Sequence, residues 1–306
     1  MLNMFNFSKP SFGLDIGHET MKIVQISGSG SNALLVGNVE IKVPENSITK
    51  TGVKNKKEIA SIINQATGLA KPNKIEAKIV ASALPESLVF TKLLELPQMS
   101  NEELAKAVPF QAMDFFPLPP EETHISWQIT GVKPDRTLEI LVVAAPKVLI
   151  DDLNETFILA GLTPLEIETK PIATTRALIN KKDKAPILII DIGAEASAMT
   201  CIDNGTIKLT STLPFGNSLI SKNPEKGVEL LANEVNHLTK YYQNKLAEPK
   251  LFKKILLSGG GANLQKIPEI LEKITRIWTE VGQPIIKIKN YNPKFAVAIG
   301  LAMKNK

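Results

Sequence analysis

Two stretches of the chain repeat the same order of features, and this repeat is the strongest constraint on the fold. From Phe12, FGLDIGHETMKIVQI reads as a strand, Asp-Ile-Gly and a second strand, followed by a Gly/Ser turn. From Ala185, APILIIDIGAEASAMTCIDNG gives the same order and ends in an Asn-Gly turn. Each glycine lets the backbone turn sharply without a Cβ clash, which predicts free amide N–H groups that face an anion. A single Asp-x-Gly is usually only a hairpin, but two copies with matching flanks predict a duplicated fold.

The elements around the two corners are those of an α/β chain. Apolar periodicity gives the first block the order β-β-β-α-β, with its helix over residues 54–69. The second corner is followed by a third strand, a long helix that opens with an Asn-Pro pair, and a strand that runs into the Gly-rich turn SGGGAN at Ser258. We expect a helix after that turn, a last strand over residues 284–290 and a last helix over residues 292–303.

Residues 85–146 differ from the blocks on either side and predict a small inserted subdomain. They read as a strand, a helix closed by prolines and a pair of strands. A Ser-x-x-Glu capping box at Ser100 marks the start of the helix. We expect Phe110, Phe115, Phe116 and Pro117 to cover the core of this insert; the alternative is that they edge a groove for a peptide.

Composition narrows the functional classes. The single cysteine, Cys201, cannot form an internal disulfide, which fits a reducing cytoplasm. No apolar run reaches the roughly 18 residues of a membrane span, and no signal peptide is evident, so we expect a soluble or peripheral protein. The formal charge is +5, but the lysines are spread along the chain, which does not favour nucleic acid as a partner. Three scattered histidines predict no metal site, and neither a Walker loop nor a Gly-x-Ser-x-Gly elbow is present.

Three glycine-bearing turns carry a resemblance to a known superfamily. DIGHETMK at Asp15, DIGAEAS at Asp191 and SGGGA at Ser258 resemble the two phosphate motifs and the adenosine motif of the actin-like ATPases. Within them, LPESLVFTKLLELP, PFQAMDFFPLPPEE, ILLSGGGANL and FAVAIGLAM are similar to the PilM family of type IV pilus assembly proteins. The resemblance spans nearly the whole chain. It implies an α/β, duplicated actin-like (ribonuclease-H-like) fold with a small inserted subdomain and a reduced second half.

The resemblance also implies a division of the chain. The first actin-like subdomain would comprise residues 1–84, completed by 147–180 and 293–306. The inserted small subdomain would be 85–146. The second actin-like subdomain would be 181–292, without most of the usual insert on the adenine side.

The function implied by the family is assembly. The protein would be a cytoplasmic component of a type IV pilus platform, or of a related secretion or competence platform, peripheral at the inner membrane through its partners. It would grip the N-terminal tail of a PilN-like membrane protein in a groove between the first subdomain and the insert. Other platform proteins are further implied partners, and self-association is left open.

ATP and Mg²⁺ are the cofactors implied by the resemblance, with no cofactor as the alternative. Asp15 and Asp191 would hold Mg²⁺ through water. The phosphates would lie against Gly17, Thr20, Lys22, Gly193 and Ala194, and the nucleoside against Gly259, Gly260 and Gly261. The candidates for a catalytic role are Asp191 and Glu168.

Several residues depart from the family pattern. His18 and Glu19 stand where a Ser or Thr is expected, and Glu195 places a carboxylate at the second turn. Lys170 takes the place of the glutamate of a Glu-Pro-x-Ala helix opening, and a charged lysine cannot accept a proton from water. We therefore predict an adaptor that binds ATP at most as a structural ligand. The alternatives are an active Mg²⁺-dependent ATPase or phosphotransferase and an FtsA-like membrane-associated filament protein.

Overall fold

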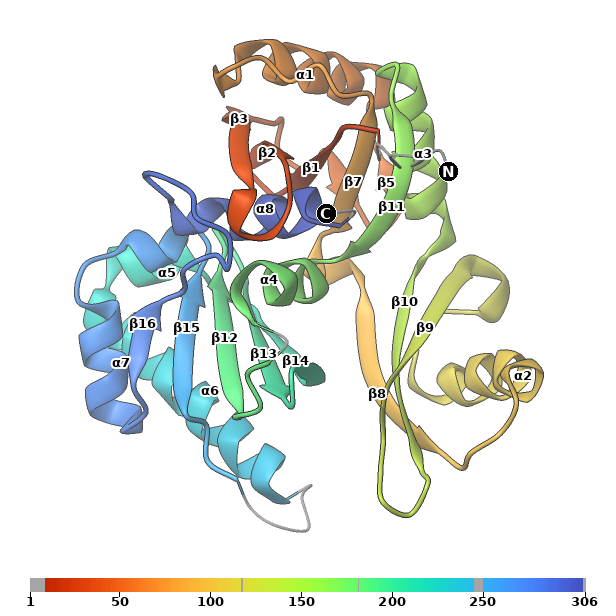
Figure 1. The fold of residues 1–306 in the computed structure, drawn as a ribbon, viewed down its shortest axis with the longest axis vertical. Coiled ribbons are helices and arrows are strands. Elements are labelled where there is room, and N and C mark those ends of the chain that lie inside the picture. The colour runs from red at the N-terminus through yellow and green to blue at the C-terminus, as the bar shows by residue number, and fades with distance from the viewer. Residues whose placement is uncertain (1–8, 117, 181, 245–249, 305–306) are drawn as a thin grey trace, which may run out of the picture.

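The computed structural model describes residues 9–116, 118–180, 182–244 and 250–304. Three sheets of three or more strands organise these residues, beside one two-stranded hairpin (Figure 1). Two large sheets carry one Asp-Ile-Gly corner each, and a third, smaller sheet belongs to the insert. The fold is actin-like α/β, as the sequence predicts. We keep the proposed division of the chain, in which each sheet marks one subdomain.

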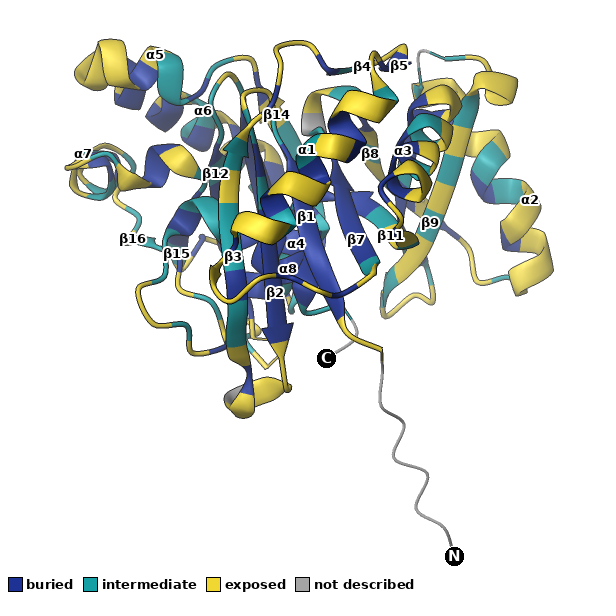
Figure 2. Cartoon of the chain, turned by 90° about the horizontal axis from the view of Figure 1, so that it is seen from above, coloured by how far each residue is buried: buried dark blue, intermediate teal, exposed yellow. Residues whose placement is uncertain are grey.

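The first large sheet has six strands. Their order is β11 (Thr163–Thr169), β7 (Ile79–Leu84), β1 (Ser11–Ile16), β2 (Thr20–Ser27), β3 (Leu34–Lys42) and β6 (Lys71–Pro72). One face packs on α1 (Lys56–Leu69) and α3 (Lys147–Leu159), where Phe12 and Phe157 are fully buried. A short hairpin, β4 (Ile48–Thr49) and β5 (Gly52–Val53), precedes α1. Figure 2 shows β1 buried along its length, because it lies in the middle of the sheet with helices on both faces.

The second large sheet has five strands. Their order is β14 (Thr206–Leu213), β13 (Ser197–Asp203), β12 (Ile187–Ile192), β15 (Lys254–Ser258) and β16 (Thr279–Val281). Three helices pack on its outer face: α5 (Asn217–Lys222), α6 (Pro224–Asn244) and α7 (Ile267–Thr275). The apolar stripe of α6 accounts for its length, since Val228, Leu231 and Val235 are fully buried at helical spacing.

Two helices lie between the large sheets and join them (Figure 1). They are α4 (Lys170–Leu178) and α8 (Ala296–Ala302), and their small residues let them approach closely. A Cβ added to Gly300 of α8 would lie 1.8 Å from the carbonyl oxygen of Ala173 in α4. The backbones of the two helices are therefore in direct contact. This contact fixes the position of the N-terminus of α4 relative to both corners.

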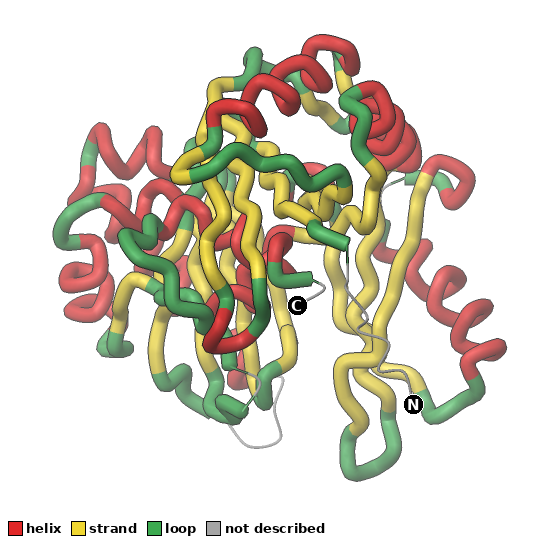
Figure 3. Tube along the Cα trace, turned by 45° about the horizontal axis from the view of Figure 1, so that its top comes forward, coloured by secondary structure: helices red, strands yellow, loops and turns green. Residues whose placement is uncertain are grey.

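The insert is a three-stranded sheet with one helix. Its strand order is β8 (Phe90–Leu96), β10 (Leu138–Pro146), β9 (Thr123–Val132), and α2 (Asn101–Ala112) packs on it with the predicted capping box. Figure 3 places the insert on the opposite side of the molecule from the outer helices of the second half. The expectation that all three phenylalanines cover its core is wrong for two of them. Phe110 and Phe115 are exposed, and Phe116 packs on the core, while Pro117 lies outside the described residues.

The remaining helical turns are of the 3-10 type and lie at element ends. They are Gly30–Asn32, Glu86–Leu88, Met113–Phe115, Pro120–Glu122, Gly260–Asn263 and Pro293–Phe295. Among the helices of the described ranges, none combines the length and the apolar character needed to cross a bilayer.

One predicted strand is absent and one helix was not predicted. Residues 284–290 form no strand; the edge strand of the second sheet is instead β16, which pairs with β15. After β16 the chain leaves the sheet, and the Ile285 amide donates to the Ala177 carbonyl of α4, so Ile286 is buried against the central helices. The unpredicted helix is α5, which has six residues and one fully buried apolar side chain, Ile220, and so gives almost no periodic signal.

Candidate functional site

The two Asp-Ile-Gly corners face a common cavity of about 240 Å³, which we call the cleft. Nine of the residues predicted for a nucleotide line it: Asp15, Gly17, Thr20, Lys22, Asp191, Gly193, Ala194, Gly259 and Gly260. Gly261 and Glu168 are not among the lining residues. The equivalence of the corners is visible in the strand register. Asp15 pairs with Lys22 and Ala83, and Asp191 pairs with Ala198 and Ser258.

Asp15 is paired with a lysine from another part of the chain. The Lys170 ammonium, at the start of α4, lies 2.8 Å from Asp15 Oδ1, and the two side chains are only 16% and 6% exposed. Burial by itself raises the pKa of Asp15. The charges of Lys170 and Lys22 and a hydrogen bond from Lys170 outweigh it, so the pKa lies below its usual value. Asp15 is therefore a carboxylate held in its charged form.

At Asp191 burial outweighs the attraction of the nearby positive charges. Burial raises the pKa of Asp191 above its usual value, and the negative charge of Asp15 adds to the shift. Attraction by Lys170 and a hydrogen bond from Ser258 Oγ, 3.2 Å from Asp191 Oδ1, offset this only in part. The second corner thus favours a protonated carboxyl more than the first does.

A network of polar side chains lies beside the first corner. Lys22 Nζ donates to Thr20 Oγ1 at 2.8 Å, and Thr20 Oγ1 donates to Glu40 at 3.1 Å. Lys294, from the 3-10 turn before α8, also donates to Glu40. Sequence reasoning missed Glu40 and Lys294. Glu40 could have been found by pairing the two predicted strands, because the register of β2 and β3 sets it directly opposite Lys22.

The corner glycines do not offer their amides to an anion. The Gly17 amide donates to the Thr20 carbonyl at 2.9 Å, and the Gly193 amide donates to the Ala196 carbonyl at 3.0 Å. Each bond closes the turn between two strands. For these two amides the expectation of free N–H groups is wrong, because the turn itself consumes them.

The start of α5 covers the second corner. The amides of Asn217 and Ser218 donate to the carbonyls of Gly193 and Ala194 at 2.7 and 2.9 Å. A Cβ on Gly216 would lie 2.4 Å from the Gly193 carbonyl oxygen, so the approach requires glycine there. These helix-start amides, which elsewhere hold anions, are thus bonded to protein carbonyls.

The Gly-rich turn mainly serves packing. Gly259 has φ of +83°, and a Cβ there would lie 2.5 Å from Asp191 Oδ1. A Cβ on Gly261 would lie 2.2 Å from the Ile192 side chain, while one on Gly260 would meet nothing within 4 Å. Only Gly260 is open. The turn therefore packs closely against the second corner through Gly259 and Gly261, and little of its backbone is exposed to the cleft.

Mg²⁺ does not fit the cleft as it stands. The described residues contain no group of three or more His, Cys, Asp or Glu side chains able to hold a metal. Mg²⁺ bound through water needs only one or two carboxylates, and Asp15 and Asp191 supply them. The Lys170 ammonium, however, already neutralises Asp15. The cleft is also smaller than most ligand pockets, which measure about 300–1,000 Å³.

Glu168, the other catalytic candidate, is engaged elsewhere. Its carboxylate accepts two hydrogen bonds from Arg176, of 2.5 and 2.7 Å, and one from Lys304 at 3.2 Å. Arg176 also donates to the Gly300 carbonyl at 2.8 Å. Glu168 thus ties β11 and α4 to α8, and the structure does not bring it to the cleft.

A second cavity of about 870 Å³, which we call the tail groove, separates the first large sheet from the insert. Its lining combines β9 and β10 of the insert with β11 and α3. In the described part of the chain, β9 and β11 are both outer strands of their sheets. Trp127, Ile158 and Leu165 give the groove an apolar character, and Glu166 and Lys304 form an ion pair of 2.7 Å within it. The groove is therefore lined by an outer strand of each sheet together with apolar side chains.

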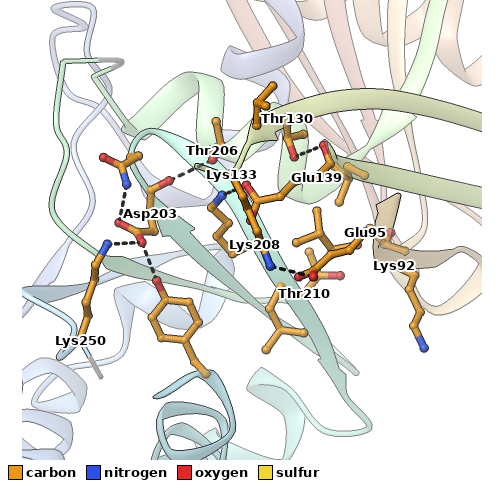
Figure 4. A pocket seen from close by; sticks show the side chains of 18 of the residues that line it. Lys92, Glu95, Thr130, Lys133, Glu139, Asp203, Thr206, Lys208, Thr210 and Lys250 are labelled. Carbon is orange, nitrogen blue, oxygen red and sulfur yellow. Dashed lines mark hydrogen bonds and ion pairs between the residues drawn. The ribbon is translucent and has the colours of Figure 1, made fainter. Parts of the chain in front are cut away.

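A third cavity, of about 770 Å³, lies between the insert and the second large sheet (Figure 4). Lys208 of β14 binds Glu139 of β10, and Asp203 accepts hydrogen bonds from Tyr242 at 3.0 Å and Lys250 at 2.8 Å. These charged groups are paired with one another. The arrangement is that of a contact between subdomains.

Comparison with known proteins agrees with this architecture. The family described as Type IV pilus assembly protein PilM matches residues 13–226. A PilM-PilN type IV pilus biogenesis complex has a chain 20% identical to this one with a TM-score of 0.79, and the match covers 96% of this chain and 98% of that one. A Bacteroides thetaiotaomicron protein with an actin-like ATPase fold is 11% identical with a TM-score of 0.51, over 98% of both chains.

A curated relative matches over a shorter region. The cell division protein FtsA of Neisseria meningitidis serogroup B is 25% identical over 115 residues, which are 37% of this chain and 27% of FtsA. This likeness is limited compared with the family match. Because that match covers more than half of the sequence, the chain belongs to the type IV pilus assembly protein PilM family.

Proposed function

We propose that the chain is an adaptor on the cytoplasmic side of a type IV pilus, or related secretion or competence, assembly platform. In this proposal it holds the N-terminal tail of a PilN-like membrane protein in the tail groove, and the tail keeps it at the inner membrane. Membership of the PilM family and the likeness to a chain of a PilM-PilN complex support the proposal. The single observation that carries it is a groove of about 870 Å³ that is lined by an outer strand of each of two sheets.

The groove has the chemistry for an extended peptide. An edge strand presents unpaired backbone N–H and C=O groups, and a peptide that adds to such an edge gains main-chain hydrogen bonds. Ile158 of α3 is 65% exposed on the groove, and Leu165 of β11 is 39% exposed. Burial of such side chains supplies the apolar part of the binding free energy. An extended tail with alternating apolar residues would satisfy both features.

Turnover of ATP is not part of this proposal. The charged ammonium of Lys170 cannot accept a proton from an attacking water, and Glu168 is held by Arg176. We expect no steady release of phosphate from ATP and Mg²⁺ beyond that of the Asp191→Asn variant. Steady release that this substitution abolishes would instead establish the enzymatic alternative.

The tail proposal is tested by anisotropy of a labelled peptide with the sequence of the PilN-like N-terminal tail. We expect saturable binding by the unaltered chain. The variant Ile158→Asp should weaken it at least about tenfold, because it places a charge on the apolar wall. The matched control is Leu34→Asp, whose side chain is 67% exposed on β3 and does not line the groove. No binding by the unaltered chain, with or without ATP, would overturn the proposal.

A second readout reports where the peptide binds. The sequence has two tryptophans, of which Trp127 lines the groove and Trp278 is 58% exposed outside it. In the Trp278→Phe variant, the peptide should shift the remaining emission to shorter wavelength as water leaves Trp127. In the Trp127→Phe variant the emission should not change. A response in the second variant alone would place the peptide outside the groove.

A further inference from the structure

Lys170 brings a positive charge to the point where the two corners face each other. Its ammonium lies 2.8 Å from Asp15 Oδ1, and its charge also attracts Asp191. The side chain is 16% exposed, so water screens this charge little. An ammonium that is paired with one corner aspartate and attracts the other, in a nearly buried site, has the role that a bound divalent ion would otherwise have.

The backbone of Lys170 is fixed. Thr174 Oγ1 donates to the Lys170 carbonyl at 2.9 Å, and Pro171 of the same turn is buried. The first turn of α4 cannot slide, because Ala173 touches the backbone of α8 at Gly300. The ammonium therefore reaches Asp15 from a rigid helix end and not from a mobile loop.

The other lysines of the cleft do not have this role. Lys22 Nζ bonds to Thr20 Oγ1, and Lys294 bonds to Glu40. Both belong to the polar network beside the first corner. Within the described residues, Lys170 is the lysine for which an ion pair with Asp15 is found.

We propose that the Lys170 ammonium is a tethered replacement for the divalent cation of the cleft, so that the folded chain takes no Mg²⁺ between Asp15 and Asp191. The charge that Mg²⁺ would neutralise is already met, and a dication placed beside the ammonium would be repelled by it. Mg²⁺ also keeps several of its waters and an octahedral shell, which need the room that the lysine side chain fills. This inference is independent of peptide binding in the tail groove.

The test is thermal unfolding of the full chain in millimolar MgCl₂, compared with NaCl of matched ionic strength. We expect the melting temperature of the unaltered chain to be the same in both salts. The variant Lys170→Met removes the ammonium and keeps the side-chain volume, so it should melt at a lower temperature. Mg²⁺ should then raise its melting temperature saturably, because binding to the folded state alone stabilises it.

Three controls locate the effect. The variant Lys170→Arg keeps a cation and should remain indifferent to Mg²⁺. The variant Lys294→Met removes another cleft lysine and should gain no response. Adding Asp15→Asn to Lys170→Met should abolish the response that Lys170→Met acquires.

A direct measurement covers the case in which Lys170→Met does not fold in NaCl. Calorimetric titration of Mg²⁺ into the unaltered chain and into Lys170→Arg should show no saturable heat. Mg²⁺ added to unfolded Lys170→Met should restore the circular dichroism spectrum of a folded chain. Saturable Mg²⁺ binding by the unaltered chain would overturn the proposal. So would a Lys170→Met chain that is neither stabilised nor refolded by Mg²⁺.

Discussion

The two Asp-Ile-Gly corners have the same backbone and opposite electrostatics. Both aspartates are the next-to-last residue of a central strand, and both corner glycines donate into their own turns. Yet at Asp15 the nearby lysine charges outweigh burial and lower the pKa, whereas at Asp191 burial prevails and raises it. The difference lies in the helix that starts at each corner: α4 brings Lys170 into an ion pair with Asp15, whereas α5 meets the second corner with backbone amides. Duplication of a fold therefore does not duplicate its site.

The largest expected difference is in the free energy of unfolding when each corner aspartate is replaced by asparagine. Asp15→Asn removes the carboxylate that pairs with the nearly buried Lys170, and breaking a buried ion pair in this way costs about 3 kcal/mol of the free energy of unfolding. Asp191→Asn replaces a carboxyl that burial already drives toward its neutral form, so we expect a change within about 1 kcal/mol. Urea unfolding of both variants measures the difference. Equal losses would contradict the contrast between the corners.

The Gly-rich turn gives a matched pair at the second corner. Gly261→Ala forces a methyl group into the Ile192 side chain and should lower the free energy of unfolding by about 1–3 kcal/mol. Gly260→Ala meets no atom within 4 Å and should change it by less than about 1 kcal/mol. The midpoints of urea unfolding compare the two. If Gly260→Ala proved the more harmful, the packing role of the turn would be wrong.

The pH dependence of stability should differ in sign between the corners. The lowered pKa of Asp15 adds stability above its unfolded pKa of about 3.8, and this is lost as the pH falls through the folded value. The raised pKa of Asp191 does the reverse, since stability declines as the pH rises from about 3.8 through the folded value. Each slope is at most about 1.4 kcal/mol per pH unit.

The free energy of unfolding is measured against pH for the unaltered chain and for each Asp→Asn variant. The difference between the two curves isolates the slope that each aspartate contributes. Asp191→Asn should remove a decline above about pH 4, whereas Asp15→Asn should remove a rise below it. Two difference curves of the same sign would show that the pKa values of the two aspartates are not shifted in opposite directions.

The smallest effect tests the hydrogen bond that distinguishes the strands beside the corners. Asp191 has Ser258 as its register partner, where Asp15 has Ala83. Ser258→Ala makes the second corner like the first in this respect and should cost about 1 kcal/mol. It should also raise the pKa of Asp191 further, because the bond favours the charged form. NMR titration of the Asp191 carboxyl measures this; a fall in the pKa would refute it.

The same two regions show how far sequence reasoning reaches. The strands around both corners, the helices α1, α3, α4 and α6, and the capping box of α2 follow from local patterns of apolar spacing and capping residues. The strand predicted over residues 284–290 failed because Ile286 is buried, and Ile288 partly buried, in the core that α4 and α8 share, and burial in a loop gives the same pattern as burial in a strand. A local apolar pattern does not show whether a neighbouring strand or a pair of helices buries the residue.

The sequence by itself determined the two corners, since a strand, Asp-Ile-Gly and a second strand encode a turn through nearby residues alone. It also marked Lys170 as an unusual residue at the start of a helix. Only the tertiary structure decided that this lysine neutralises Asp15 and that α5 covers the second corner. Those contacts join residues far apart in the chain, and the packing of α4 on α8 between the two sheets sets their distance.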